Sequence, residues 1–249
     1  MDLGLSGRVA LVTGASKGIG RGIATALAAE GARVAVTSRS RERIEATAAE
    51  IGAEAFVHDN VDLDAVPELV AGVEDRLGPI EVLVASTGGP PTSPDPLGFP
   101  REQWDEAYRT LVLAPMAIVE RVVPGMRERG FGRIVSVSSS AVREPIPGLM
   151  LSNSHRAALL GALKTLAREV ARDGVTVNSI LPGRIATDRI IQMSGSREDA
   201  ERAAAEQVPA GRLGTVEEFA DVAAFLCSER ASYVTGTATL VDGGLTQGV

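Results

Sequence analysis

Short apolar runs alternate along the chain with longer segments of helical periodicity. The apolar runs, rich in β-branched residues, span 8–14, 33–39, 54–59, 81–86, 132–140, 175–183 and 237–244. Segments with apolar positions at helical spacing include 20–31, 41–52, 65–78 and 148–171. Runs of this kind are typical of parallel strands that are buried on both faces of a sheet. Because strands and helices alternate and no repeat or linker divides the chain, we predict one doubly wound α/β domain over residues 1–249.

Two segments depart from this alternation. The stretch 87–100, TGGPPTSPDPLGFP, is rich in proline and glycine, and it is too short to separate two domains. We predict a loop beside a site there. The stretch 188–209 has a helical pattern, and its Ile190, Ile191 and Met193 are candidates for an apolar pocket wall. These residues are too few to name a substrate.

Composition narrows the possible partners. Of the 249 residues, 45% are apolar and 23% are charged, and the net charge is −7. These values are typical of a globular protein in solution, and without a basic block they argue against nucleic acid or an anionic membrane as a partner. The N-terminal residues lack a signal-peptide pattern, and no apolar run approaches the ~18 residues of a membrane span. We therefore expect a cytoplasmic protein.

Cysteine and histidine are scarce. The single cysteine, Cys227, excludes an intrachain disulfide and a cysteine-rich metal site, and we expect it to pack inside a helix. The two histidines, His58 and His155, are too scattered to indicate zinc. The sequence therefore predicts no metal centre.

Three glycines follow the first apolar run. In VTGASKGIGRGIA, Gly14, Gly18 and Gly20 lie between a predicted strand and a predicted helix. A pyrophosphate at a helix N-terminus needs close backbone N–H groups, and a Cβ would obstruct that approach. The pattern therefore favours a dinucleotide-binding turn, and the alternative is a tight turn without a ligand.

The second apolar run ends without an acidic residue. Many NAD-binding sites hold the ribose hydroxyls with a carboxylate at this point. This chain has Ser38 and then Arg39, and Lys17 is available in the glycine-rich turn. Cations here would favour a 2′-phosphate, so NADP is preferred over NAD. The alternative is that Arg39, Arg41 and Arg43 form only a solvated start of the next helix.

Together these motifs resemble the short-chain dehydrogenase/reductase family, in particular its 3-oxoacyl-(acyl-carrier-protein) reductase-like branch. The matching stretches are TGASKGIG at 13–20, Asp59 in VHDNVD, VNSILPGRIATD at 177–188 and the C-terminal segment 211–244. The resemblance implies a Rossmann domain with a seven-stranded parallel sheet, a small carbonyl or hydroxyl substrate, and a homotetramer or less often a dimer. The cofactor-binding residues are then Gly14, Ser16, Lys17, Gly18, Ile19, Gly20, Ser38, Arg39, Asp59, Asn60, Ser86, Gly88, Arg156, Pro182, Gly183, Ile185 and Thr187.

The departures from the family lie where its chemistry takes place. The family's catalytic Ser corresponds to Ser139, but its Tyr corresponds to Ser152, its Lys to Arg156 and its helix Asn to Leu111. The family's Asn-Ala-Gly after the fourth strand is Ser-Thr-Gly at 86–88. A serine hydroxyl is far less acidic than a phenol, and Arg156 cannot release a proton. Standard catalysis is therefore doubtful.

Two residues remain as candidates for the missing chemistry. Ser139 is a candidate to hydrogen-bond the substrate, the alternative being an ordinary serine at a strand end. On a helix, positions 152, 155 and 156 share a face, so His155 would flank Ser152, and its pKa near ~6.5 suits proton transfer. The other interpretation of His155 is packing or an interface.

Three functions remain open from the sequence. The first is an NADP-dependent oxidoreductase. The second is a catalytically inactive protein that binds a nucleotide or partners another subunit. The third is a non-redox enzyme that uses the same pocket for elimination, isomerisation or cyclisation.

Overall fold

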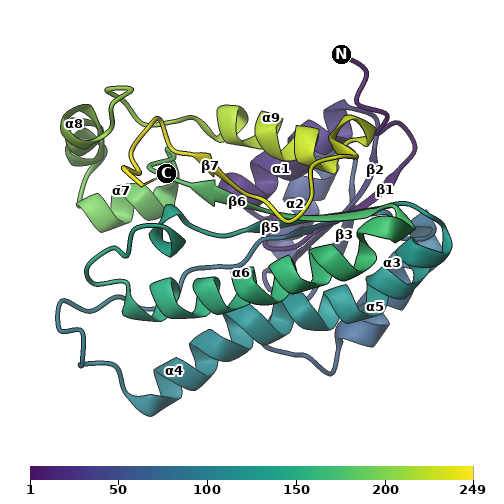
Figure 1. Cartoon of the computed structure of the whole chain (residues 1–249), viewed down its shortest axis with the longest axis horizontal. Helices are drawn as coiled ribbons and strands as arrows, with labels where there is room; N and C mark the ends of the chain where they lie inside the picture. The colour runs from purple at the N-terminus through teal and green to yellow at the C-terminus, as the bar shows by residue number, and fades with distance from the viewer. Residues whose placement is uncertain (249) are drawn as a thin grey trace.

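Seven parallel strands form a single sheet through the middle of the molecule (Figure 1). A computed structural model describes residues 1–248, so the last residue of the predicted range 1–249 lies outside the described part. The strands are β1 Val9–Val12, β2 Arg33–Ser38, β3 Glu54–Val57, β4 Val82–Ala85, β5 Gly132–Val137, β6 Val175–Pro182 and β7 Ala238–Val241. Their order in the sheet is β3-β2-β1-β4-β5-β6-β7. The predicted doubly wound α/β fold with a seven-stranded parallel sheet is confirmed.

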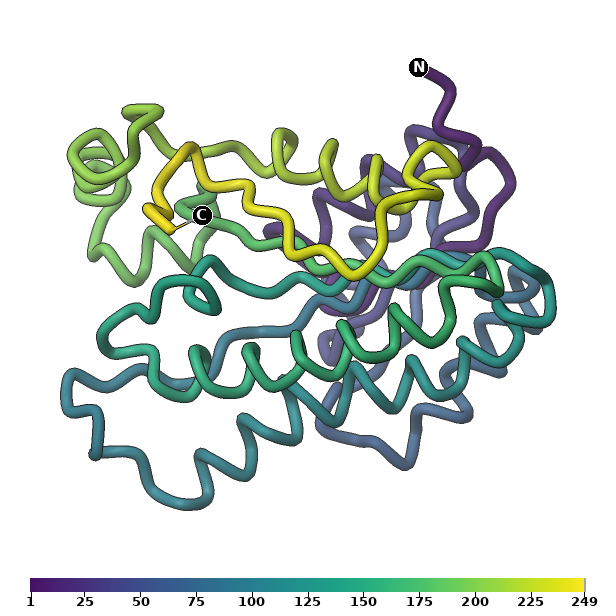
Figure 2. Tube along the Cα trace, in the orientation of Figure 1, coloured from purple at the N-terminus to yellow at the C-terminus, as the bar shows by residue number. Residues whose placement is uncertain are grey.

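Helices cover both faces of this sheet, as the continuous apolar strands require. The helices are α1 Gly18–Ala29, α2 Arg41–Ile51, α3 Val66–Leu77, α4 Arg101–Tyr108, α5 Ala114–Glu128, α6 Met150–Val170, α7 Asp188–Ser194, α8 Arg197–Gln207 and α9 Val216–Cys227. One face packs on Ile23 of α1, Ile44 of α2 and Phe219 of α9. The other packs on α3, α5 and α6, with Ile118 and Leu159 buried against the strands. The trace in Figure 2 shows β7, from the end of the chain, lying beside β6.

Two details of the helices bear on the site. Helix α6 lies within the predicted segment 148–171 and begins just after Gly148, whose φ of 79° is left-handed. Helices α4 and α5 are joined by a π-helical segment, Arg109–Leu113, which the apolar pattern did not predict. Leu111 is buried within it. Single π-turns of this kind are frequent at functional sites.

Cys227 is the last residue of α9 and is fully buried, so the predicted packing role is confirmed. Burial raises the pKa of its thiol to about 12. The thiol is therefore protonated and inert at neutral pH.

The order of the strands reverses at β1. Strand β1 pairs with β2 on one side and with β4 on the other, so the strands before and after this point extend the sheet in opposite directions. Open α/β sheets bind ligands at the carboxyl ends of the strands at such a switch point. Here Thr13 and Ser86 join the two strand ends. The Thr13 hydroxyl donates to the Ser86 carbonyl at 2.8 Å and accepts from the Ser86 N–H at 2.9 Å. The switch point therefore places the glycine-rich turn next to the residues that follow β4.

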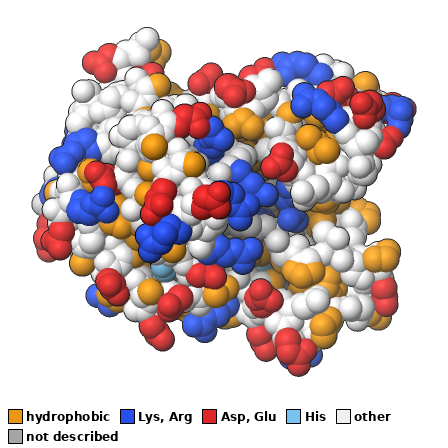
Figure 3. Space-filling model, turned by 180° about the vertical axis from the view of Figure 1, so that it is seen from behind, with side chains coloured by type: hydrophobic (Ala, Val, Ile, Leu, Met, Phe, Trp, Pro, Cys, Tyr) orange, Lys and Arg blue, Asp and Glu red, His pale blue; other side chains and the backbone are white. Residues whose placement is uncertain are grey.

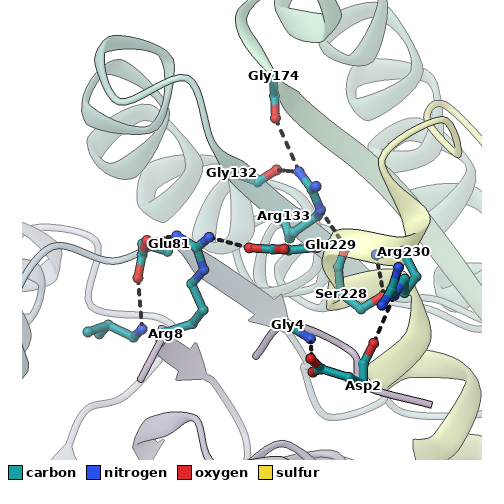
Figure 4. Close-up of polar contacts among 11 residues, drawn as sticks. Asp2, Gly4, Arg8, Glu81, Gly132, Arg133, Gly174, Ser228, Glu229 and Arg230 are labelled. Carbon is teal, nitrogen blue, oxygen red and sulfur yellow. Dashed lines mark hydrogen bonds and ion pairs between the residues drawn. The ribbon is translucent and has the colours of Figure 1, made fainter. Parts of the chain in front are cut away.

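A buried cation anchors the region around the start of β5. Arg133 donates to the backbone carbonyls of Gly132, Gly174 and Ser228 (Figure 4). Its guanidinium also lies 4.3 Å from the centre of the Phe131 ring. Burial lowers the pKa of Arg133, but three carbonyl dipoles and the negative charge of Glu229 nearby offset part of the cost of burying it.

We expect Arg133→Leu to lower the free energy of unfolding by about 2–4 kcal/mol, because the substitution leaves three carbonyl acceptors without this donor. Urea unfolding followed by circular dichroism measures the change. The control is Arg127→Leu, which removes an exposed ion pair with Asp173 and should cost less than about 1 kcal/mol. Equal losses in the two variants would contradict this account.

Candidate active site

The turn between β1 and α1 is built so that backbone groups approach one another closely. A Cβ on Gly14 would lie 2.6 Å from the Ser86 carbonyl oxygen, and one on Gly20 would lie 2.5 Å from the Gly14 carbonyl oxygen. Gly14 also has a φ of 60°, which favours glycine. Helix α1 begins at Gly18, and no side chain caps its N-terminus. Its first N–H groups are therefore free to bind an anion such as a pyrophosphate.

A cavity of about 480 Å³ opens from this turn. It is lined by eight of the residues predicted to bind the cofactor: Gly14, Ser16, Lys17, Ser38, Arg39, Asp59, Asn60 and Gly88. These residues come from segments after β1, β2, β3 and β4, which the sheet order brings together at one edge. Figure 3 shows basic side chains gathered beside a hollow on one face of the molecule.

The other predicted cofactor residues lie near this edge without lining the cavity. Gly18, Ile19 and Gly20 form the first turn of α1, and Ser86 follows β4. The segment after β6 is held by two contacts: the Gly183 N–H donates to the Val241 carbonyl at 3.1 Å, and Ile185 forms a bridge with Gly214. The remaining members of the set are Pro182, which ends β6, Thr187, which precedes α7, and Arg156 in α6.

Twelve further residues that the sequence did not assign to the cofactor also line the cavity, and three of them are polar neighbours of the assigned ones: Ser40, Arg43 and His58. Arg39 and Arg43 both line the cavity, whereas Arg41 is exposed and pairs with Glu45 outside it. Arg39 and Arg43 therefore lie on the cavity side, whereas Arg41 faces away. Because residues four positions apart lie on the same side of a helix, the spacing of Arg39 and Arg43 is the sequence signal that could have separated Arg43 from Arg41.

His58 lines the cavity and holds a buried polar atom without a partner in the described part of the chain. Its side chain is buried, and Nε2 has no hydrogen-bond partner among the described residues. Burial lowers its pKa, although Asp62 and Asp59 act in the opposite direction. A buried polar atom without a partner is costly. The fit to a dinucleotide rests instead on the cradle at Gly14 and Gly20, which a Cβ would fill, and on Lys17 and Arg39 at the cavity.

Arg156 joins three segments beneath the loop after β4. Its guanidinium donates to the Ser152 hydroxyl at 3.2 Å, to the Val137 carbonyl at 3.0 Å and to the Gly88 carbonyl at 3.3 Å. Ser152 and Arg156 are both buried. Burial, followed by the like charge of Arg189, lowers the pKa of Arg156 to about 10. The guanidinium therefore stays charged at neutral pH and releases no proton there.

Ser139 and Ser138 differ in their surroundings. The Ser139 hydroxyl accepts from the Ala141 N–H at 3.2 Å and caps a short 3₁₀ turn, Ser140–Val142. Ser139 is partly exposed, whereas the Ser138 hydroxyl is buried without a partner in the described structure. The Ser139 hydroxyl can still donate its proton to a ligand.

His155 makes its contacts away from Ser152. Its Nδ1 lies 2.7 Å from the Leu151 carbonyl, so Nδ1 carries the proton in this bond. Its ring packs on α4, with ring centres 5.5 Å from Trp104 and 6.2 Å from Tyr108. Arg156, one residue later, turns instead to the strand ends. The placement of His155 supports the packing interpretation and gives no support to a role in proton transfer.

Comparison with known proteins identifies the relatives of this arrangement. A family model described as "Enoyl-(Acyl carrier protein) reductase" matches residues 14–246. The human "Dehydrogenase/reductase SDR family member 4" is 37% identical over 248 residues, covering 96% of this chain and 88% of that protein. This chain belongs to the short-chain dehydrogenase/reductase family. The 3-oxoacyl-[acyl-carrier-protein] reductase FabG of Escherichia coli (strain K12) is 35% identical over 248 residues, covering 98% of this chain and 99% of that protein.

A solved structure of the same family has the same architecture. L-sorbose reductase from Gluconobacter frateurii, complexed with NADPH and L-sorbose, superimposes with a TM-score of 0.93 at 33% identity, and the match covers 100% of both chains. In this short-chain dehydrogenase/reductase, two residues that the sequence matched to the family's catalytic positions lie around Gly88 and the cavity. Leu111 lines the cavity from the π-helical segment, and Arg156 contacts Gly88 from below it. Leu111 and Arg156 thus both lie on the side of the site next to the loop after β4.

The structure contributes two observations on metals and membranes. Among residues 1–248, no group of three or more His, Cys, Asp or Glu side chains is placed to hold a metal ion. Within the same residues, every helix falls short of the length and apolarity that crossing a membrane requires.

Proposed function

We propose that this short-chain dehydrogenase/reductase is an NADP-dependent oxidoreductase that acts on a small carbonyl or hydroxyl compound. The observation that carries the proposal is the cavity of about 480 Å³, which brings Lys17, Arg39 and Arg43 together beside the uncapped start of α1. A dinucleotide with an additional phosphate matches this distribution of cations. The NADPH bound to L-sorbose reductase supports the same cofactor.

Each part of the cavity has a role in this proposal. The N–H groups at the start of α1 and Lys17 would hold the pyrophosphate, and Arg39 and Arg43 would hold the 2′-phosphate. Asp59 and Asn60 would contact the adenine, as the family resemblance implies. When bound, the cofactor supplies or accepts a hydride.

Proton transfer is the step that this chain changes. The Ser152 oxygen accepts from Arg156, so its own O–H remains available as a donor. A serine hydroxyl releases its proton far less readily than a tyrosine does, and Arg156 cannot relay one. A general acid typically contributes ~10²–10⁴-fold to rate. We therefore propose that ordinary ketone reduction is slow or absent.

The presence of Ser152 and Arg156 at the positions of the family's Tyr and Lys also favours a second function, binding without catalysis. If the site supports no proton transfer, the protein binds NADP as a sensor or as the partner of another subunit. A non-redox reaction in the same pocket is the third possibility. A search for turnover across a panel of carbonyl compounds, with dinucleotide binding measured separately, distinguishes an oxidoreductase from a protein that only binds.

Two other features remain predictions. A cytoplasmic location follows from the sequence alone. The homotetramer follows from the family resemblance, and the outward face of α6 supports it: Ala157, Ala158, Gly161 and Thr165 are exposed. Small residues allow helices of two subunits to pack closely. Light scattering at micromolar concentration should give a tetramer, and a monomer would contradict the prediction.

NADP should bind more tightly than NAD by about 1–3 kcal/mol, because charge-assisted hydrogen bonds would hold the 2′-phosphate. Calorimetric titration of both cofactors measures the difference. Arg39→Asp should reverse the preference. Arg41→Asp makes the same charge change outside the cavity and should leave the preference intact. Equal affinities of the unmodified protein for NAD and NADP would refute the proposal.

Replacing Ser152 by Tyr and Arg156 by Lys together should raise ketone reduction by ~10²–10⁴-fold, provided that the pocket has room for a phenol. Absorbance at the nicotinamide band with an activated ketone measures the rate. His155→Ala should change little, because His155 packs on α4. Brisk activity of the unmodified protein that His155→Ala abolishes would instead assign proton donation to His155.

A further inference from the structure

Two arginine side chains bond to the backbone carbonyls of neighbouring glycines after β4. Arg156 donates to the Gly88 carbonyl at 3.3 Å, and Arg189 of α7 lies 3.5 Å from the Gly89 carbonyl. A Cβ on Gly89 would lie 2.2 Å from the Cζ atom of Arg189. The missing side chain at Gly89 therefore lets the second guanidinium lie against the backbone. One arginine is buried, and the other is exposed to solvent.

Neither guanidinium has a carboxylate partner within residues 1–248. The ion pairs of this part of the chain involve other arginines, including Arg197 and Arg202 on the adjacent α8. Three of the five N–H groups of Arg156 bond to neutral oxygens, so two remain. A buried charge without a counter-ion is costly. The pair of arginines therefore favours an anion between them.

The repulsion between the two arginines also favours binding of an anion. The charge of Arg189 adds to burial in lowering the pKa of Arg156 to about 10. Burial also lowers the pKa of Arg189. An anion that contacts both groups would relieve the repulsion and compensate for the lost hydration.

The phosphates of the proposed cofactor already have cations of their own. Lys17 and the start of α1 serve the pyrophosphate, and Arg39 and Arg43 serve the 2′-phosphate. Gly88 and Gly89 line that cavity, but neither Arg156 nor Arg189 does. The anion that fits the arginine pair is therefore a group other than these phosphates.

Resting on the proposed oxidoreductase function, we propose that the substrate carries a carboxylate, and that Arg156 and Arg189 bind this group beside the Gly88–Gly89 segment. The two spare N–H groups of Arg156 and the fork of Arg189 suit the two oxygens of a carboxylate. The substrate class is then an oxo acid or a hydroxy acid. Arg189 acts here as a specificity-determining residue at the open side of the site.

Calorimetry with matched probes tests the proposal. The probes are pyruvate, acetoacetate and benzoylformate, each compared with its neutral methyl ester, on protein loaded with NADP. The unmodified protein should bind at least one acid ~10–100-fold more tightly than its ester. Because Arg189 is exposed, Arg189→Gln should remove this advantage without unfolding the protein. Arg197→Gln removes an equal charge from α8, where Arg197 pairs with Glu201, and should keep the advantage.

The other outcomes of the calorimetry separate failure of the carboxylate site from failure of the proposed NADP-dependent function. Equal binding of acids and esters, no binding of any acid, or an acid preference that survives Arg189→Gln would overturn the carboxylate site. Loss of NADP affinity in Arg189→Gln, with the acid-to-ester ratio unchanged, would assign this arginine to the cofactor and overturn it as well. Failure of the unmodified protein to bind NADP would overturn the proposed function. In that case the acid preference, measured without NADP, still tests the arginine pair.

Discussion

The ends of β1 and β4 approach each other backbone to backbone, and the arrangement of the site depends on this contact. Gly14 lies so near the Ser86 carbonyl that a side chain would not fit, and the Thr13 hydroxyl bonds to both backbone groups of Ser86. This contact holds the glycine-rich turn beside the segment after β4. It thereby sets the nucleotide cavity against the loop that carries Gly88 and Gly89.

The arginines in two regions of the molecule differ in how the chain compensates their positive charge. Around the start of β5, the buried Arg133 donates to three backbone carbonyls and stacks on Phe131, so its charge is accommodated within the chain. At the carboxyl edge, Arg156 and Arg189 bond to the neighbouring Gly88 and Gly89 carbonyls, and neither has a carboxylate partner among the described residues. Low dielectric strengthens an attraction to a matching anion as much as it penalises a lone charge. The carboxyl edge is therefore where a ligand gains most from binding.

The two sides of the site relate differently to the short-chain dehydrogenase/reductase family. The glycine-rich turn and the residues after β2 and β3 keep the pattern of a dinucleotide site and gather around one cavity. On the other side lie Ser152, Arg156 and Leu111, which the sequence resemblance matches to the family's Tyr, Lys and Asn. The replaced Lys position does not leave an empty space, because Arg156 ties α6 to β5 and to Gly88. Arg156 keeps the positive charge of that position, but it is buried and bonds to backbone carbonyls.

The sequence by itself determined the doubly wound fold, because apolar strand runs and helical spacing are local patterns that survive without tertiary contacts. It also located the glycine-rich turn and eight of the residues that line the cavity, since these follow directly after strands whose ends must meet at one edge. Only the tertiary structure separated Arg43 from Arg41, turned His155 toward Trp104, and brought Arg189 to Gly89. Side-chain direction and contacts between distant segments decide these placements, and one-dimensional spacing carries neither. The approach of Arg156 and Arg189 to neighbouring glycine carbonyls is such a placement, made by two helices that only the packed sheet brings together.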